Sequence, residues 1–140
     1  MQWYIAAILS AVFAAATSIL AKMGIKDVNS NLATAIRTSF VLVITWGIVF
    51  WQKLLPGISN ISKNSWIFLV LSAVATGLSW VFYFYALKLG EASKVAPIDK
   101  LSLVITIVLA AMILGEKITW AKSIGAVLMT VGAIVIALSH

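Results

Sequence analysis

Residues 65–87 read SWIFLVLSAVATGLSWVFYFYAL, a run of 23 residues without one charged side chain. A helix needs about 20 mostly apolar residues to cross the hydrocarbon core of a bilayer. In lipid only helices and closed barrels satisfy their own backbone hydrogen bonds, and a barrel strand takes only about 10 residues. This stretch therefore predicts a membrane-spanning helix.

Four other apolar runs fill most of the chain on either side of it. They cover residues 3–21, 31–51, 97–115 and 118–139. The charged residues inside them are Arg37, Asp99, Lys100 and Lys122. The connecting segments are too short to separate two domains. We therefore expect an all-α protein of five transmembrane helices that forms a single domain over residues 1–140.

Composition excludes a water-soluble domain. Of the 140 residues, 63% are hydrophobic and 10% are charged, and the mean hydropathy is +1.11. A soluble domain has roughly 25% charged residues, so too few charges are present here to cover a globule in water. The net charge of +6 comes from lysines that stand singly between apolar runs and from one arginine, a pattern that favours lipid headgroups and not nucleic acid as the partner.

Several chemistries are not expected from these residue types. Cysteine is absent, and the single histidine is His140. The sequence has no phosphate-binding loop, no cluster of metal ligands and no plausible pair of nucleophile and base. We therefore expect no metal, no cofactor and no enzymatic activity.

The positive charges are nearly balanced between the two sides of the membrane. The side that holds the N-terminus receives Lys53, Lys63, Lys117 and Lys122, and the opposite side receives Lys22, Lys26, Lys88 and Lys94. Arg37 and Lys100 lie slightly inside the membrane on that second side. The positive-inside rule needs an asymmetry to set orientation, and here the bias is weak. Insertion in both orientations and a fixed topology set by weak cues both remain open.

Polar residues follow one face of the third predicted span. Ser72, Thr76, Ser79 and Tyr83 are spaced by 4, 3 and 4, which keeps them on one side of a helix, with Trp80 beside them. The fourth span continues the pattern, and the second offers Thr34, Thr38 and Thr45. We expect a substrate cavity lined by Thr76, Ser79, Trp80, Tyr83, Ser102 and Thr106. The alternative is helix packing, in which these hydroxyl groups bond across helices or to their own turn.

Arg37 and Asp99 are candidates for gating or coupling. By helical rise Arg37 lies about 9 Å into its span, on the same side of the membrane as Asp99. Together they can form a charged gate or hold an anionic or zwitterionic substrate. Two alternatives stay open. Arg37 can extend to the interface, and Asp99 can complement the N-terminus of a helix that Pro97 opens.

The second half of the chain resembles a known family. Residues 82–117 read FYFYALKLGEASKVAPIDKLSLVITIVLAAMILGEK, and residues 124–138 read IGAVLMTVGAIVIAL. The third span ending in YALKLG, the ASKVAPI opening of the fourth and the LGE at its close are similar to the EamA family of the drug/metabolite transporter superfamily. NLATAIRTSF, at 31–40, fits its short members.

The resemblance implies one five-helix EamA-like unit, which is half of a ten-helix inverted-repeat transporter. An odd-span unit that is duplicated and fused places its second copy upside down. A single unit then needs a partner. The near-balanced lysines fit an antiparallel homodimer, as in the related small multidrug resistance proteins. A parallel homodimer and a separate partner chain remain open. The fifth span, with small residues such as Gly125 and Gly132, is a candidate dimer contact.

The function implied is transport of small polar or amphipathic metabolites by alternating access, in the inner (cell) membrane of a prokaryote. The alternatives are a non-transporting subunit of a larger membrane complex and a component of a lipid-carrier flippase. The small multidrug resistance proteins place a coupling carboxylate in their first span, whereas this chain has none there. Coupling would therefore use Asp99, Glu116 or no carboxylate.

Overall fold

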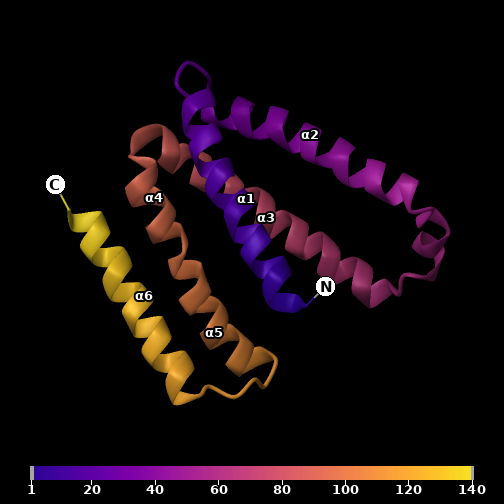
Figure 1. The fold of residues 1–140 in the computed structure, drawn as a ribbon. Coiled ribbons are helices and arrows are strands. Elements are labelled where there is room, and N and C mark those ends of the chain that lie inside the picture. The colour runs from indigo at the N-terminus through magenta and orange to yellow at the C-terminus, as the bar shows by residue number, and fades with distance from the viewer. Residues whose placement is uncertain (1, 140) are drawn as a thin grey trace. The chain divides into compact units, whose positions relative to one another are not determined.

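The computed structural model describes residues 2–139, and these residues are helical apart from short connections (Figure 1). The helices are α1 (Trp3–Gly24), α2 (Ser30–Trp51), the 3-10 helix η1 (Leu55–Asn60), α3 (Lys63–Leu89), α4 (Ala92–Asp99), α5 (Leu101–Ile113) and α6 (Trp120–Leu138). Five segments are long and apolar enough to cross a membrane, with α4 and α5 counted together as Ala92–Ile113. The predicted all-α fold with five spans is confirmed. His140 lies outside the described residues.

Local side-chain chemistry explains where two of the helices begin. The side chain of Asn29 accepts a hydrogen bond of 2.9 Å from the backbone N–H of Asn31 at the start of α2. Thr119 does the same for the N–H of Lys122 at the start of α6, at 3.3 Å. Each cap satisfies one of the N–H groups that a helix leaves without an internal partner.

The fourth span differs from its prediction at its start. It begins at Ala92, after Glu91 in an extended conformation, so Pro97 lies inside α4 instead of opening a helix. Asp99 is the last residue of α4, and Lys100 joins α4 to α5. A proline inside a helix lacks the N–H that would bond to the fourth residue before it, which weakens the helix there. The prediction that Pro97 opens the helix and that Asp99 lies in its first turn is therefore wrong, since Asp99 ends α4 and directly precedes Lys100, the N-cap residue of α5.

The chain divides into two compact units. The terminal unit consists of residues 1–22 and 89–140. In it α4 and α5 pack along α6, which runs back beside them (Figure 1). Two lysines connect distant parts of this unit by hydrogen bonds. The ammonium of Lys22 donates to the carbonyl of Gly90 at 2.6 Å, and that of Lys94 donates to the carbonyl of Ser139.

The central unit consists of residues 23–88. It is a helical hairpin in which η1 connects α2 to α3 (Figure 1). At the other end of the hairpin, Lys88 donates a hydrogen bond of 2.8 Å to the carbonyl of Val28. Phe84 and Leu87 of α3 are buried, as are Ser30 and Thr34 of α2. Most other apolar side chains of both units are exposed, a surface suited to lipid or to another protein.

Candidate functional site

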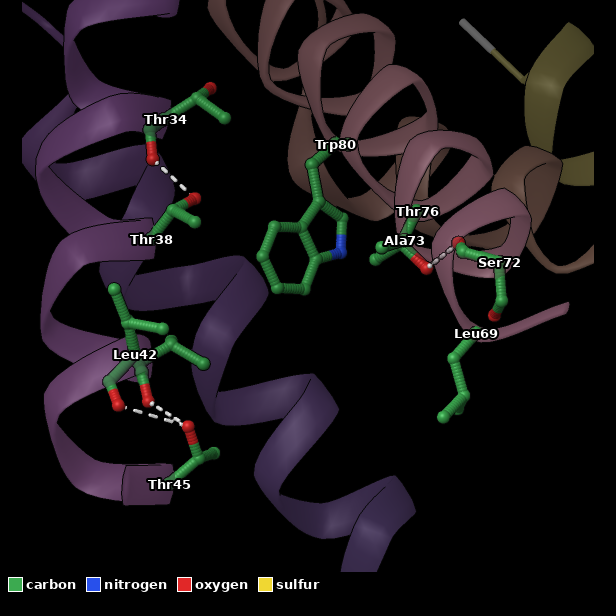
Figure 2. Close-up of a pocket in the computed structure, with 11 residues that line it drawn as sticks. Thr34, Thr38, Leu42, Thr45, Leu69, Ser72, Ala73, Thr76 and Trp80 are labelled. Carbon is green, nitrogen blue, oxygen red and sulfur yellow. Dashed lines mark hydrogen bonds between the residues drawn. The ribbon is translucent and has the colours of Figure 1, made fainter. Parts of the chain in front are cut away.

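A groove of about 400 Å³ lies in the central unit between α2 and α3 (Figure 2). Its lining comes from one face of each helix: Thr34, Thr38, Val41, Leu42 and Thr45 of α2, and Leu69, Ser72, Ala73, Thr76, Gly77 and Trp80 of α3. The volume lies in the range of sites that hold small molecules. The walls are mainly apolar, with the hydroxyl groups spaced along them, as in a site for an amphipathic ligand.

The hydroxyl groups of the groove face it as hydrogen-bond acceptors. Four threonines donate to the carbonyl four residues earlier in their own helix: Thr34 to Ser30 (2.8 Å), Thr38 to Thr34 (2.8 Å), Thr45 to Val41 (2.9 Å) and Thr76 to Ser72 (2.9 Å). A hydroxyl group has one hydrogen to donate and two lone pairs to accept with. Because the hydrogen is used within the helix, each threonine oxygen still has a lone pair to offer a ligand.

Arg37 does not line the groove itself, but it contacts Trp80, which does. The carbon at the centre of its guanidinium group is 4.8 Å from the centroid of the Trp80 ring and 5.2 Å from that of Phe84. Both distances are within the range of cation–π attraction. Trp80 lines the groove as well, and its indole extends from α3 toward the side of α2 that carries Thr34 and Thr38 (Figure 2). The arginine and the groove therefore share one wall.

The structure brings together two of the six predicted substrate residues. Thr76 and Trp80 line the groove. Ser79 does not line it, and neither does Tyr83, whose ring meets Phe84 edge-on at 6.1 Å. Ser102 and Thr106 lie on α5 in the terminal unit, where the hydroxyl of Thr106 donates to the carbonyl of Ser102 at 2.8 Å. Substrate contact by all six residues stays a prediction.

Two features of the site were not among the residues assigned to it from sequence. Thr34, Thr38 and Thr45 of α2 line the groove, and their spacing of 4 and 7 was the available signal. The other feature is Phe84, four residues after Trp80 on the same helical face, which completes the pair of rings around Arg37. An arginine inside an apolar span needs such partners, because an unpaired charge in lipid is costly.

Two carboxylates of the terminal unit form ion pairs with nearby lysines. Asp99 forms an ion pair with its neighbour Lys100 at 3.2 Å, and Glu116 forms one with Lys122 at 3.6 Å. Lys100 also lines a second groove of the terminal unit, whose other wall consists of alanines and serines of α1. Arg37 and Asp99 belong to different units, so their action as a pair stays a prediction.

These features define a class of protein. Five apolar membrane-length helices are those of a multi-pass membrane protein. The profile of the EamA-like transporter family matches residues 1–138, and the chain belongs to this family. The resemblance noted from the motifs is therefore confirmed.

Two relatives are similar to the chain. A Sinorhizobium protein named "uncharacterized transporter in cobO 3'region" is 44% identical over 140 residues, which is 97% of this chain and 96% of that protein. An uncharacterized protein of Methanocaldococcus jannaschii is 34% identical over 71 residues, which is 51% of this chain and 52% of that protein. No solved structure matches the chain.

Proposed function

We propose that the protein transports small polar or amphipathic metabolites across the membrane by alternating access, as an antiparallel homodimer. The observation that carries the proposal is the groove between α2 and α3, with its threonine oxygens and with Arg37 against its lining residue Trp80. Membership of a transporter family supports a membrane transporter in general. The groove adds a place where a polar molecule can lie among apolar helices.

The dimer is proposed because one unit of five spans is half of an inverted-repeat transporter. The near-equal numbers of lysines on the two sides favour protomers that insert in opposite directions. The Sinorhizobium relative, which aligns over 96% of its length, has a similar size. In this proposal residues 1–140 act as one functional domain, with α6 as the candidate dimer contact.

Within this proposal, the groove residues Thr76 and Trp80 contact the substrate from α3. Ser79, Tyr83, Ser102 and Thr106 are further candidates for contact during the transport cycle. Arg37 and Asp99 gate the path or couple it to an ion. The membrane in question is the inner membrane of a prokaryotic cell, a location supported by the bacterial and archaeal sources of the two relatives.

Reconstitution tests this function. Purified protein in sealed liposomes should take up members of a panel of small polar metabolites above the level of protein-free liposomes. Replacing Thr38 and Thr76 together with valine keeps the shape of the groove, removes two acceptor oxygens and should lower uptake by about thirtyfold, since each lost hydrogen bond is worth about 1 kcal/mol. Unchanged uptake in that double variant would place the path elsewhere.

A second candidate is a non-transporting subunit of a larger membrane complex, for example a lipid-carrier flippase. The extensive exposed apolar surface favours it, because such surface also suits a protein partner. Uptake by the protein alone in liposomes would rule this candidate out. A pure protein that transports nothing from the panel, but does so when a partner chain is added, would support it.

A further inference from the structure

We propose that Arg37, held between Trp80 and Phe84, is the binding site for the oxyanion of the ligand, and that the threonine face beyond it accepts hydrogen bonds from the same molecule. The ligand class is then a small organic anion, a carboxylate or a phosphate ester, that also carries O–H or N–H groups. This inference rests on the proposed function, because it names the chemistry of the substrate that the groove would hold.

The rings of Trp80 and Phe84 contact only part of the Arg37 guanidinium group. The two rings approach the guanidinium carbon within 4.8 and 5.2 Å, and such ring contacts are made through the face of the cation. The N–H groups point outward from its edge in a fork that matches a carboxylate or a phosphate. Within residues 23–88 these N–H groups donate no hydrogen bond, and the one carboxylate of that unit, Asp27, is not paired with Arg37.

Arg37 and its two ring partners lie well inside their helices, away from the helix ends. Arg37 lies seven residues after Ser30, roughly 10 Å along α2. Its ring partners lie nine and five residues before Leu89, roughly 14 and 8 Å from the end of α3. Helical side chains lean toward the N-terminus of their helix, which carries these rings still further from that end. The rings therefore hold the guanidinium alongside α3, and the side chain does not extend out to the interface.

Holding a cation inside a membrane-spanning helix costs free energy. A cation with unpaired donors at this depth is unfavourable, and two ring contacts offset only part of the penalty. An oxyanion supplies both the opposite charge and the missing acceptors. Lipid phosphate and a soluble organic anion share this chemistry, and the experiment below separates them.

The groove would hold the part of the ligand that lies beyond its oxyanion. Trp80 belongs both to the ring pair and to the groove, so a molecule bound at Arg37 continues along the groove. There it meets Thr34, Thr38 and Thr76, whose hydrogens are used by their own helices. Donors on the ligand match this face, and further acceptors do not. Arg37 and the threonines thus select opposite ends of one molecule.

The test is a binding measurement on the purified full chain in a maltoside detergent, which contains no phosphate. The soluble probes share a three-carbon skeleton: glycerate and glycerol 3-phosphate, which carry the anion and hydroxyl groups, propionate, which has only the anion, and glycerol, which has only the hydroxyls. Phosphatidylglycerol added to the micelles is the lipid probe. Glycerate or glycerol 3-phosphate should bind more tightly than propionate and glycerol.

Arg37→Gln should weaken that binding by about tenfold or more, because a hydrogen bond to a charged group is lost. Arg37→Lys, which keeps the charge but loses the fork, should lie between. The control is Lys63→Gln, which removes an exposed cation at the start of α3 and should bind as wild type. Thr38→Val should reduce the preference for glycerate over propionate.

Each outcome decides the proposal. Binding of the soluble anions that depends on Arg37 supports a substrate site, whereas dependence seen only with phosphatidylglycerol assigns the same oxyanion site to lipid phosphate. Binding that is equal in wild type, Arg37→Gln and Arg37→Lys, with all three proteins folded by circular dichroism, overturns it. Anion binding without uptake in liposomes would reject the proposed function and leave this site standing. Uptake of organic anions at the same rate in wild type and Arg37→Gln would support the proposed function and reject this site.

Discussion

At the scale of single residues, the charges of the central unit and the terminal unit are accommodated differently. Arg37 contacts two aromatic rings, and Asp99 pairs with the next residue in the chain. An ion pair between sequence neighbours is exposed and weak, so Asp99 stays free to exchange partners. Arg37, by contrast, is held in place by Trp80 and Phe84. The proposed gate would use this difference between a fixed cation and an exchangeable carboxylate.

Transport by single and double variants tests whether the two residues act together. Arg37→Ala and Asp99→Asn should each lower the uptake rate, and the double variant should lose less than the sum of the two effects. Residues in contact show interaction energies of roughly 0.5 to 3 kcal/mol, whereas distant residues add. Additive losses in the activation free energy of uptake would mean that the two residues act separately. The Asp99–Lys100 pair would then be purely local.

At the scale of elements, the interruption between α4 and α5 is the feature least expected from a run of apolar residues. Pro97 deprives the carbonyl of Ser93 of its helical partner, and the interruption follows three residues later at Lys100. Two short helices joined in this way can bend relative to each other more easily than one continuous span. Such a joint is useful to a protein whose helices rearrange during transport.

Pro97→Ala should restore the missing hydrogen bond. A proline costs about 3 kcal/mol inside a helix, so the variant should gain roughly 1 kcal/mol or more in free energy of unfolding. We expect slower uptake in the same variant, because a stiffer span bends less. The control is Pro56→Ala in η1, which lies outside the spans and should change neither quantity appreciably. Faster or unchanged uptake in Pro97→Ala would remove the joint from the transport cycle.

The elements were predictable from sequence to different degrees. The five spans follow from length and hydropathy, since every residue of a run adds to the same signal. The predicted start of the fourth span was wrong because a proline fits the first turn of a helix better than its interior, and the sequence does not reveal which position Pro97 takes. Only some of the residues that line the groove were predicted. Periodicity placed Thr76 on a polar face of α3, but which helix meets that face depends on packing, so Thr34 and Thr38 were not assigned.

At the scale of the whole molecule, the proposed antiparallel homodimer raises the question of which way each copy inserts. Cysteine labelling answers it because the chain has no cysteine of its own. Asp27→Cys and Asn60→Cys place single exposed thiols in connections at opposite ends of the central unit. Ser30 is less suitable, because it is buried. In a population with both orientations, each thiol should react in part with a membrane-impermeant reagent applied outside intact cells. Labelling of one site only, with the other fully protected, would contradict dual topology.

We propose that the groove between α2 and α3 is a hydrated path for substrate. The most direct measurement compares Thr76→Cys, inside the groove, with Leu78→Cys, two residues further along α3 and exposed outside it. In liposomes, a water-soluble thiol reagent should modify Thr76→Cys and block its uptake, and a transported anion should protect that cysteine. Leu78→Cys, facing lipid, should stay unmodified and active. If Thr76→Cys is as unreactive as Leu78→Cys, the groove is dry and packed, and the protein does not carry its substrate there.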